Sequence, residues 1–308
     1  MTSTTITRGA ATGTAAETRR RRLSPARILL NVFLTATALA WLFPVLWAVF
    51  NSFRDYDYTS EHGYVSLGGF TFQNYVNAWE QGEFTRHFLN SLYITVPAVL
   101  LTLFLASCVA FVVARFSFRF NLILLGVFTA ANLLPQQALL IPLFRLYREV
   151  PLPLWMSDSG QLLDSYWGLI LVNTAFQTGF CTFVLSNYMK ALPHEMFEAA
   201  RVDGASYLQL FRKIALPLTK PALIVTFVFE FRASWTDLMR PLIYLRDSDT
   251  FTVPRGLKSL VDQFGFGGEF RWEIIITASV ITTVPMVILF FLGQRHFVQG
   301  IATTGSKG

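Results

Sequence analysis

Six apolar stretches, each long enough to cross a lipid bilayer as a helix, dominate this chain of 308 residues. A membrane-spanning helix needs about 20 mostly apolar residues. Only 14% of the residues are charged, whereas a soluble protein carries roughly a quarter. We therefore predict an all-α integral membrane protein with six transmembrane helices. The stretches lie at about 28–50, 88–114, 120–144, 166–189, 217–244 and 273–293.

Basic residues are distributed unevenly among the segments that join these stretches. If both ends of the chain lie on one side, most of the 25 Lys and Arg residues lie on that side too. Cytoplasmic segments of membrane proteins carry such an excess, so both termini are predicted to be cytoplasmic. The net charge of +6 is explained in this way without a nucleic-acid partner. Cys108 and Cys181 lie within apolar stretches and show neither metal-binding nor disulfide spacing.

The chain is predicted to consist of three parts. Residues 1–23 are rich in Thr, Ala and Arg and lack apolar periodicity, which is typical of a disordered, basic cytoplasmic tail. The first apolar stretch is longer than the core of a signal peptide, which indicates an uncleaved helix whose basic flank can contact membrane lipid. Residues 24–297 form the six-helix domain, with a polar loop at 190–217, and residues 298–308 form a C-terminal cytoplasmic tail.

The polar loop reads EAARVDGASYLQLFRKIALP from Glu198 to Pro217. Pro193 and the acidic residues after it favour the start of a helix. The alanines after Glu198 favour its continuation, and Asp203 with Gly204 favours a turn that ends it. A second helix is predicted from about Ala205 and leads toward the fifth stretch. The loop is therefore predicted to be a helix–turn–helix on the cytoplasmic face.

This loop resembles the signature of the membrane subunits of ATP-binding-cassette (ABC) importers, which has the same residue types at the same intervals. The resemblance implies the type I ABC importer fold, with a cytoplasmic coupling helix that docks into a separate ATPase. It implies as partners a second homologous permease, two ATPase subunits that bind ATP and Mg, and an extracytoplasmic substrate-binding protein. The ATPase-coupling residues that it implies are Glu198, Ala199, Ala200, Asp203, Gly204, Ile214, Leu216 and Pro217.

Further motifs resemble the carbohydrate-uptake branch of these permeases, and the second of its two permease types. They are Asn90-Ser91-Leu92, Ile141-Pro142-Leu143, the Phe72–Tyr75 segment, Trp235 with Asp237 and Pro241, and the end of the chain from Gln294. The resemblance covers about residues 25–308. It implies the import of a disaccharide or oligosaccharide across a bacterial or archaeal cytoplasmic membrane. A glycerol phosphate, a polyamine and an amino acid are alternative solutes.

Glu230, Arg232 and Asp237 interrupt the fifth stretch. A charge at the centre of a membrane helix costs roughly 2.5–3.5 kcal/mol, so such groups usually face protein or a water-filled cavity. On one continuous helix Glu230 and Asp237 share a face, and Arg232 points nearly opposite. One interpretation is ion pairing with neighbouring helices. The other is a sugar path lined by Glu230, Trp235 and Asp237, because carboxylates bind hydroxyl groups and indole rings stack on sugars.

The sequence lacks several motifs that would indicate ATP binding, catalysis or metal binding. No lysine follows a glycine, so the chain lacks a phosphate-binding loop of the GxxxxGK[ST] type. Neither a Ser–His–Asp order nor an H-E-x-x-H motif nor a Cys/His cluster occurs. We therefore expect no enzyme activity and no resident cofactor or metal. Two other classes of protein stay open: an ATP-independent secondary transporter, and a membrane-embedded enzyme that uses Glu230 and Asp237.

Overall fold

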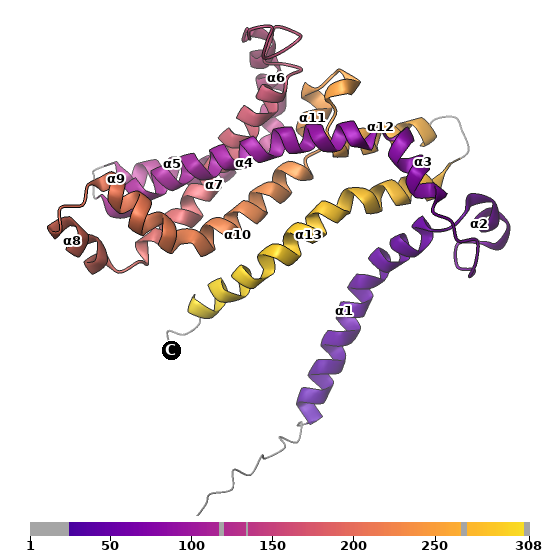
Figure 1. The fold of residues 1–308 in the computed structure, drawn as a ribbon, viewed down its shortest axis with the longest axis horizontal. Coiled ribbons are helices and arrows are strands. Elements are labelled where there is room, and N and C mark those ends of the chain that lie inside the picture. Colours follow the sequence, from indigo (N-terminus) through magenta and orange to yellow (C-terminus); the bar gives the residue numbers. More distant parts are fainter. Residues whose placement is uncertain (1–24, 117–119, 134, 266–269, 305–308) are drawn as a thin grey trace, which may run out of the picture. The chain divides into compact units, whose positions relative to one another are not determined.

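The computed structural model describes residues 25–116, 120–133, 135–265 and 270–304. Within these ranges the regular structure is helical, with two isolated β-bridges and no strand, which confirms the predicted all-α class (Figure 1). In chain order the helices are α1 (Pro25–Ser52), α2 (Tyr56–His62), α3 (Gln73–Gln81), α4 (Phe84–Arg115), α5 (Asn121–Leu133), η1 (Gln136–Leu139), α6 (Leu140–Glu149), α7 (Tyr166–Lys190), α8 (His194–Val202), α9 (Tyr207–Gln209), η2 (Leu210–Ala215), α10 (Leu216–Trp235), α11 (Met239–Tyr244), η3 (Ser248–Thr250), α12 (Val253–Gly265) and α13 (Trp272–Thr304).

The chain divides into two units, Met1–Trp47 and Ala48–Gly308. The described part of the first unit belongs to α1, whose exposed side chains are mostly apolar, as expected where lipid surrounds a helix. The predicted tail at 1–23 lies outside the described residues. At the other end of the chain, α13 continues to Thr304. Residues 298–304, which were predicted to belong to the C-terminal tail, are therefore helical.

Four long helices form the centre of the second unit. α4 packs along α7, and α10 packs against α4, α7 and α13 (Figure 1). The buried face of α4 carries small side chains, among them Ala98, Ala106 and Ala110, which are at most 2% exposed. Small residues let helix backbones approach closely, and this close packing holds helices together in lipid. The long helices thus form a bundle whose association does not depend on the hydrophobic effect.

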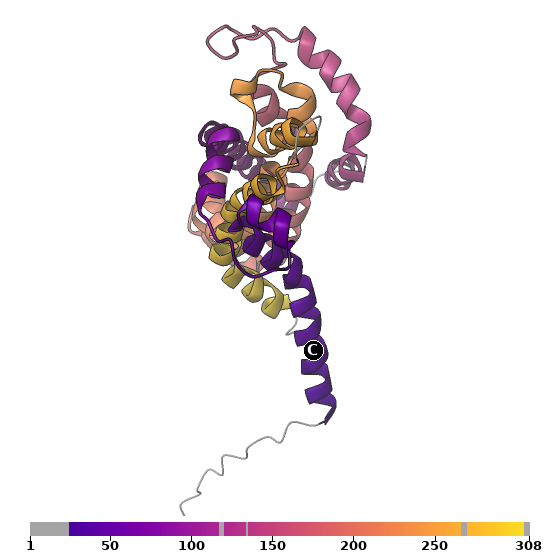
Figure 2. The same cartoon turned by 90° about the vertical axis from the view of Figure 1, so that its right-hand side faces the viewer.

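Five of the described helical segments are long and apolar enough to cross a membrane: Pro25–Ser52, Phe84–Arg115, Tyr166–Lys190, Tyr207–Tyr244 and Trp272–Gln294. The predicted stretch at 120–144 is not one continuous helix, because it is divided among α5, η1 and α6. Pro135 has an extended backbone (φ −63°, ψ 115°) between α5 and η1, and a proline lacks the N–H that a continuing helix needs. Both views show α6 leading away from the bundle (Figures 1 and 2).

The predicted stretch at 217–244 is also interrupted. α10 ends at Trp235 and α11 begins at Met239. Asp237 lies in the break, where its Oδ1 atom accepts a hydrogen bond from the backbone N–H of Arg240 (3.4 Å). Such side-chain-to-backbone bonds compete with helix formation. The prediction that Glu230 and Asp237 share one helix face is therefore wrong, because Asp237 is not on the helix that carries Glu230.

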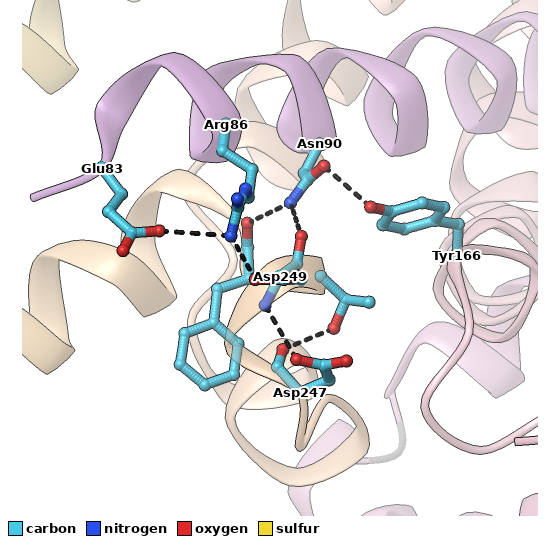
Figure 3. A network of polar contacts seen from close by, with 8 residues as sticks. Glu83, Arg86, Asn90, Tyr166, Asp247 and Asp249 are labelled. Carbon is cyan, nitrogen blue, oxygen red and sulfur yellow. Dashed lines mark hydrogen bonds and ion pairs between the residues drawn. The ribbon is translucent and has the colours of Figure 1, made fainter. Parts of the chain in front are cut away.

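A polar network holds the first turns of α4 against two other segments (Figure 3). The Asn90 amide donates hydrogen bonds to the backbone oxygens of Asp249 (2.7 Å) and Phe251 (3.0 Å) and accepts one from the Tyr166 hydroxyl (2.8 Å). Arg86 forms an ion pair with the Asp249 side chain. Asn90, part of a motif that resembled sugar permeases, therefore joins α4 to the start of α7 and to the segment before α12.

Candidate functional site

The polar loop folds into a helical hairpin whose first arm is α8. The helix ends at a left-handed glycine, since Gly204 has φ of +85°. The backbone N–H of Ala205 donates to Ala200 O (2.9 Å), and that of Gly204 donates to Arg201 O (3.0 Å). These two bonds form a Schellman motif, which satisfies the last carbonyls of the helix. A Cβ atom at position 204 would meet nothing within 4 Å. Glycine is therefore needed for the backbone conformation, and the space around it is open.

The second arm of the hairpin runs into α10 without a break. Ser206 and Gln209 form a reciprocal capping box at its start, with bonds of 2.8 and 3.4 Å. α9, the π-helical η2 and α10 follow one another directly, so Ile214, Leu216 and Pro217 belong to one helical stretch. η2 ends just before Pro217, which cannot donate a backbone hydrogen bond. The second arm of the hairpin and the membrane helix are therefore one continuous helical element.

One face of α8 packs against the rest of the protein, and the other face is exposed. Phe197 is 4% exposed and packs into a hydrophobic cluster from α4, α7 and η2, with Ala200 at its edge. On the open face the Glu198 carboxylate lies 3.1 Å from Nδ1 of His194, and both side chains are about two-thirds exposed. The other predicted residues of this surface, Ala199, Asp203 and Gly204, are exposed as well. The structure thus brings the predicted residues of the first arm together on one accessible hairpin.

Apolar side chains extend this accessible surface. Val202 is 88% exposed, Leu208 is 62% exposed and Met196 is 45% exposed. Met196 and Val202 were not predicted to belong to this site, although both lie close to Glu198 and Gly204 in the sequence. Exposed apolar residues that lie together on a polar segment usually mark a site of protein contact. We call the exposed residues Met196, Glu198, Ala199, Val202, Asp203, Gly204 and Leu208 the hairpin surface.

A second group of polar residues lies inside the bundle around Glu230. Glu230 of α10 is 4% exposed, and the Cys181 thiol of α7 lies next to its carboxylate. A cavity of about 10 Å³ borders this carboxylate, which is room for about one water molecule. The cavity is lined by Ala98, Val99, Thr102, Asn173, Gln177, Glu230, Ser234 and Arg240. Helices α4, α7 and α10, together with Arg240 of α11, thus border a small space lined by six polar and two apolar residues.

Arg240 connects this space to the break in the fifth stretch. Its guanidinium donates hydrogen bonds to Oδ1 of Asn173 and to Oε1 of Gln136 (2.5 Å), and Nε lies 3.5 Å from Oδ2 of Asp237. The same group lies over the Phe176 ring, 5.2 Å from its centroid. Arg240 therefore joins α11 to α7, to η1 and to the end of α10. We call Asn173, Gln177, Glu230, Ser234 and Arg240 the polar cluster.

The three residues predicted to line a path do not lie together. Glu230 borders the cavity, whereas Asp237 pairs with Arg240. Trp235 is 3% exposed and stacks on Phe231, with ring centroids 5.6 Å apart. Its indole N–H donates to the backbone oxygen of Thr282 on α13 (3.3 Å). Trp235 is therefore a packing residue between α10 and α13 in this conformation.

Arg240 and Asn173 were missed by the sequence analysis. Arg240 looked like one of several basic residues at the outer end of the fifth stretch, and Asn173 stood alone among apolar residues. The available signal was the spacing of Asp237 and Arg240, since residues three apart in a turn of helix lie close enough to pair. Among the described residues no group of three or more His, Cys, Asp or Glu side chains could hold a metal ion.

A set of membrane-crossing helices with an accessible helical hairpin between two of them agrees with a transport permease. The chain belongs to the family of binding-protein-dependent transport system inner membrane components, whose model matches residues 98–303. It is therefore an inner-membrane permease subunit of an ABC-type transport system, as the resemblance of its polar loop predicted.

Two relatives illustrate this membership, and one solved structure illustrates the fold. The arabinooligosaccharides transport system permease protein AraQ of Halalkalibacterium halodurans is 30% identical over 294 residues, which cover 94% of this chain and 100% of that protein. The alpha-glucoside transport system permease protein AglG of Rhizobium meliloti is 36% identical over 239 residues, which cover 78% of this chain and 61% of that protein. A bacterial ABC transporter involved in the import of the acidic polysaccharide alginate has a TM-score of 0.74 at 22% identity, over 88% of this chain and 95% of that chain. This likeness confirms the expected type of permease fold.

Proposed function

We propose that this permease imports a disaccharide or oligosaccharide and that a separate pair of ATPase subunits, which bind ATP and Mg, drives it. The substrate class is supported by AraQ and AglG, which are named for arabinooligosaccharides and alpha-glucosides. A second, homologous permease supplies the other half of the path. A binding protein delivers the sugar from outside, in keeping with the family's dependence on such proteins.

The observation that carries the proposal is the hairpin surface. An exposed carboxylate, small residues and exposed apolar side chains share one short hairpin, while the opposite face is anchored by Phe197. The combination suits insertion into a cleft of another protein, because the apolar residues gain from burial and the alanines allow close approach. The direct continuation of the hairpin into α10 gives docking a route into the bundle. Glu198, Ala199, Ala200, Asp203 and Gly204 form the docking end, and Ile214, Leu216 and Pro217 form its connection.

The polar cluster is the candidate for this chain's part of the sugar path. Carboxylate, amide, hydroxyl and guanidinium groups are the donors and acceptors that bind sugar hydroxyls. Glu230 carries the path assignment best, since it borders the cavity at the junction of α4, α7 and α10. Asp237 and Trp235 contribute indirectly, Asp237 by holding Arg240 and Trp235 by packing α10 on α13. A cavity of this size is a closed path, which must widen to pass a sugar.

The orientation follows from the same proposal. The hairpin must face the cytoplasm, where the ATPase and ATP are found, so both termini are cytoplasmic. This agrees with the excess of basic residues on that side. The network around Asn90, at the opposite end of α4, then faces outward.

Reconstituted transport tests the docking role of the hairpin. The complete importer, with both permeases, both ATPases and the binding protein, is placed in proteoliposomes, and uptake of labelled oligosaccharide is measured. Glu198→Lys should abolish uptake while the complex still assembles, because a cation replaces the exposed carboxylate. Glu149→Lys makes the same reversal in α6, far along the chain from the hairpin, and serves as the matched control. Normal uptake with Glu198→Lys would remove the docking assignment.

A further inference from the structure

Arg115 makes contacts that reach from α4 to two other elements at the hairpin end of the bundle. It is the last residue of α4, and its Nη2 atom donates hydrogen bonds to the backbone oxygens of Met189 (2.7 Å) and Leu192 (3.3 Å). The centre of its guanidinium lies 3.6 Å from the centroid of the Phe197 ring on α8. One half-buried side chain therefore touches the end of α7, the connector to α8, and α8 itself.

The two kinds of contact make different chemical demands. The oxygens of Met189 and Leu192 lie where α7 ends, and carbonyl groups at a helix C-terminus attract a cation. Lysine could meet that demand. A lysine ammonium can also lie over a ring, but it has neither the flat face that stacks on Phe197 nor the fixed fork of donors that reaches the carbonyl oxygens at the same time. Arginine therefore satisfies both partners at position 115 better than lysine does.

Phe197 lies on the buried face of α8, which is the helix that carries part of the hairpin surface. It directly precedes Glu198, but its ring points into the protein and is 4% exposed, whereas Glu198 is about two-thirds exposed. α8 is a single rigid helix of 9 residues. Any displacement imposed on Glu198 is therefore imposed on the Phe197 ring, and Arg115 is the charged group against which that ring moves.

The second arm of the hairpin has its own attachment to the end of α4. Phe111 packs on Phe211 with ring centroids 5.3 Å apart, and Phe116 packs on Tyr207 at 5.0 Å. These aromatic contacts hold the α9 and η2 side of the hairpin without Arg115. Weakening the contact of Arg115 with Phe197 should therefore leave the hairpin folded and attached, while the first arm keeps its apolar packing and loses its polar link to α4 and α7.

We propose that the stacked pair of Arg115 and Phe197 is the contact that transmits movement of α8 to α4 and α7, so that it couples ATP hydrolysis to opening of the path. The proposal rests on the proposed function, because it assumes that an ATPase moves α8. Arg115 acts as a positioning residue, since it touches neither nucleotide nor sugar. The pair adds a direct connection between α8 and the helices α4 and α7. These two helices border the polar cluster together with α10.

A double-mutant cycle in the reconstituted importer tests this pair. The variants are Arg115→Lys, which keeps the cation, Phe197→Leu, which keeps the apolar bulk, and the two combined. Uptake of labelled oligosaccharide and ATP hydrolysis are measured in the same proteoliposomes and expressed per assembled complex. Lys220→Ala, which removes another basic residue near the start of α10, is the matched control.

If Arg115 and Phe197 act through one contact, we expect a distinctive pattern of results for the variants. Each single variant should raise the ATP hydrolysed per sugar transported about tenfold, as expected from the loss of a partly buried cation–π contact, with normal yield of the complex. The double variant should be no worse than either single variant, because residues that act through one contact are not additive. The Lys220→Ala variant should behave as the wild type.

Contrary results would show whether the role of Arg115 fails alone or together with the docking role of the hairpin. Wild-type coupling in the single variants, additive losses in the double variant, or a lowered yield with normal uptake per complex would each overturn the role of Arg115. Glu198→Lys is measured alongside. If Glu198→Lys blocks uptake while Arg115→Lys and Phe197→Leu do not change it, only the Arg115 inference fails. If Glu198→Lys transports normally, the docking role fails and the inference fails with it.

Discussion

The Arg240 guanidinium donates a hydrogen bond to Oδ1 of Asn173 and thereby joins α11 to the middle of the bundle. Asn173 in turn donates from its amide nitrogen to the Ser234 hydroxyl on α10 (3.1 Å). Arg240 is only 8% exposed and Asn173 only 5%. A single asparagine therefore links the two pieces of the interrupted fifth stretch through α7.

Replacing Arg240 with methionine should destabilise the assembled permease by about 3 kcal/mol, because it leaves the Asp237 carboxylate and the Asn173 amide without their buried partner. The thermal unfolding temperature of the purified complex is the measurement. Arg246→Met is the matched control, since Arg246 is exposed. Equal shifts for the two variants would mean that the buried contacts of Arg240 contribute nothing to stability.

Glu230→Gln and Asp237→Asn should have separable effects. Glu230 borders the cavity, so its neutral variant should change the ranking of sugars in uptake competition while thermal stability stays near normal. Asp237 pairs with Arg240, so its neutral variant should lower thermal stability and leave the ranking of sugars unchanged. The reverse pattern would move the path assignment from Glu230 to Asp237.

Much of this arrangement is readable from the sequence, for physical reasons. Long apolar runs with few charges identify membrane helices, and a glycine six residues after Glu198 identifies the turn of the hairpin, because both signals are local. The interruptions at Pro135 and Asp237 were harder to locate. Proline is tolerated within some membrane helices, and indeed Pro97 lies inside the continuous helix α4. Sequence alone does not distinguish a proline that bends a helix from one that ends it.

The pairings across helices were not readable at all. Arg115 contacts Phe197, Arg240 contacts Asn173 and Trp235 contacts Thr282. The two residues of each pair lie far apart in the sequence, so these contacts depend on how the helices pack. Helical periodicity places a residue on a face but does not say which neighbour covers that face. Trp235 shows the consequence, since its fit to a family motif suggested a sugar contact, whereas its ring lies in the packing between helices.

Gly204→Ala should weaken the hairpin by about 1 kcal/mol, because an alanine is strained in the left-handed conformation even where space is open. We expect slower uptake with normal assembly, measured as the initial rate in proteoliposomes. Gly126→Ala is the control, because a Cβ at that helical position also meets nothing within 4 Å and Gly126 has no positive φ. An unchanged rate for Gly204→Ala would show that the turn tolerates an alanine without loss of docking.

Labelling of introduced cysteines should reveal the two sides of the membrane. Val202→Cys in the hairpin and Leu67→Cys in the segment between α2 and α3 are both well exposed, at 88% and 79% in the native residues. In intact cells an impermeant thiol reagent should label position 67 and leave position 202 unlabelled until the cells are opened. Labelling of position 202 from outside would reverse the orientation and put the hairpin out of reach of ATP.

The dependence of uptake on enclosed ATP decides whether this permease works as part of an ATP-driven importer. Proteoliposomes that contain the complete importer, with ATP and Mg enclosed on the side of the ATPases and the binding protein with labelled oligosaccharide outside, should accumulate sugar. The same vesicles without ATP, or with the two permeases but no ATPase, should not. Accumulation at the full rate in vesicles that lack the ATPase would contradict the account and identify the chain as an ATP-independent transporter.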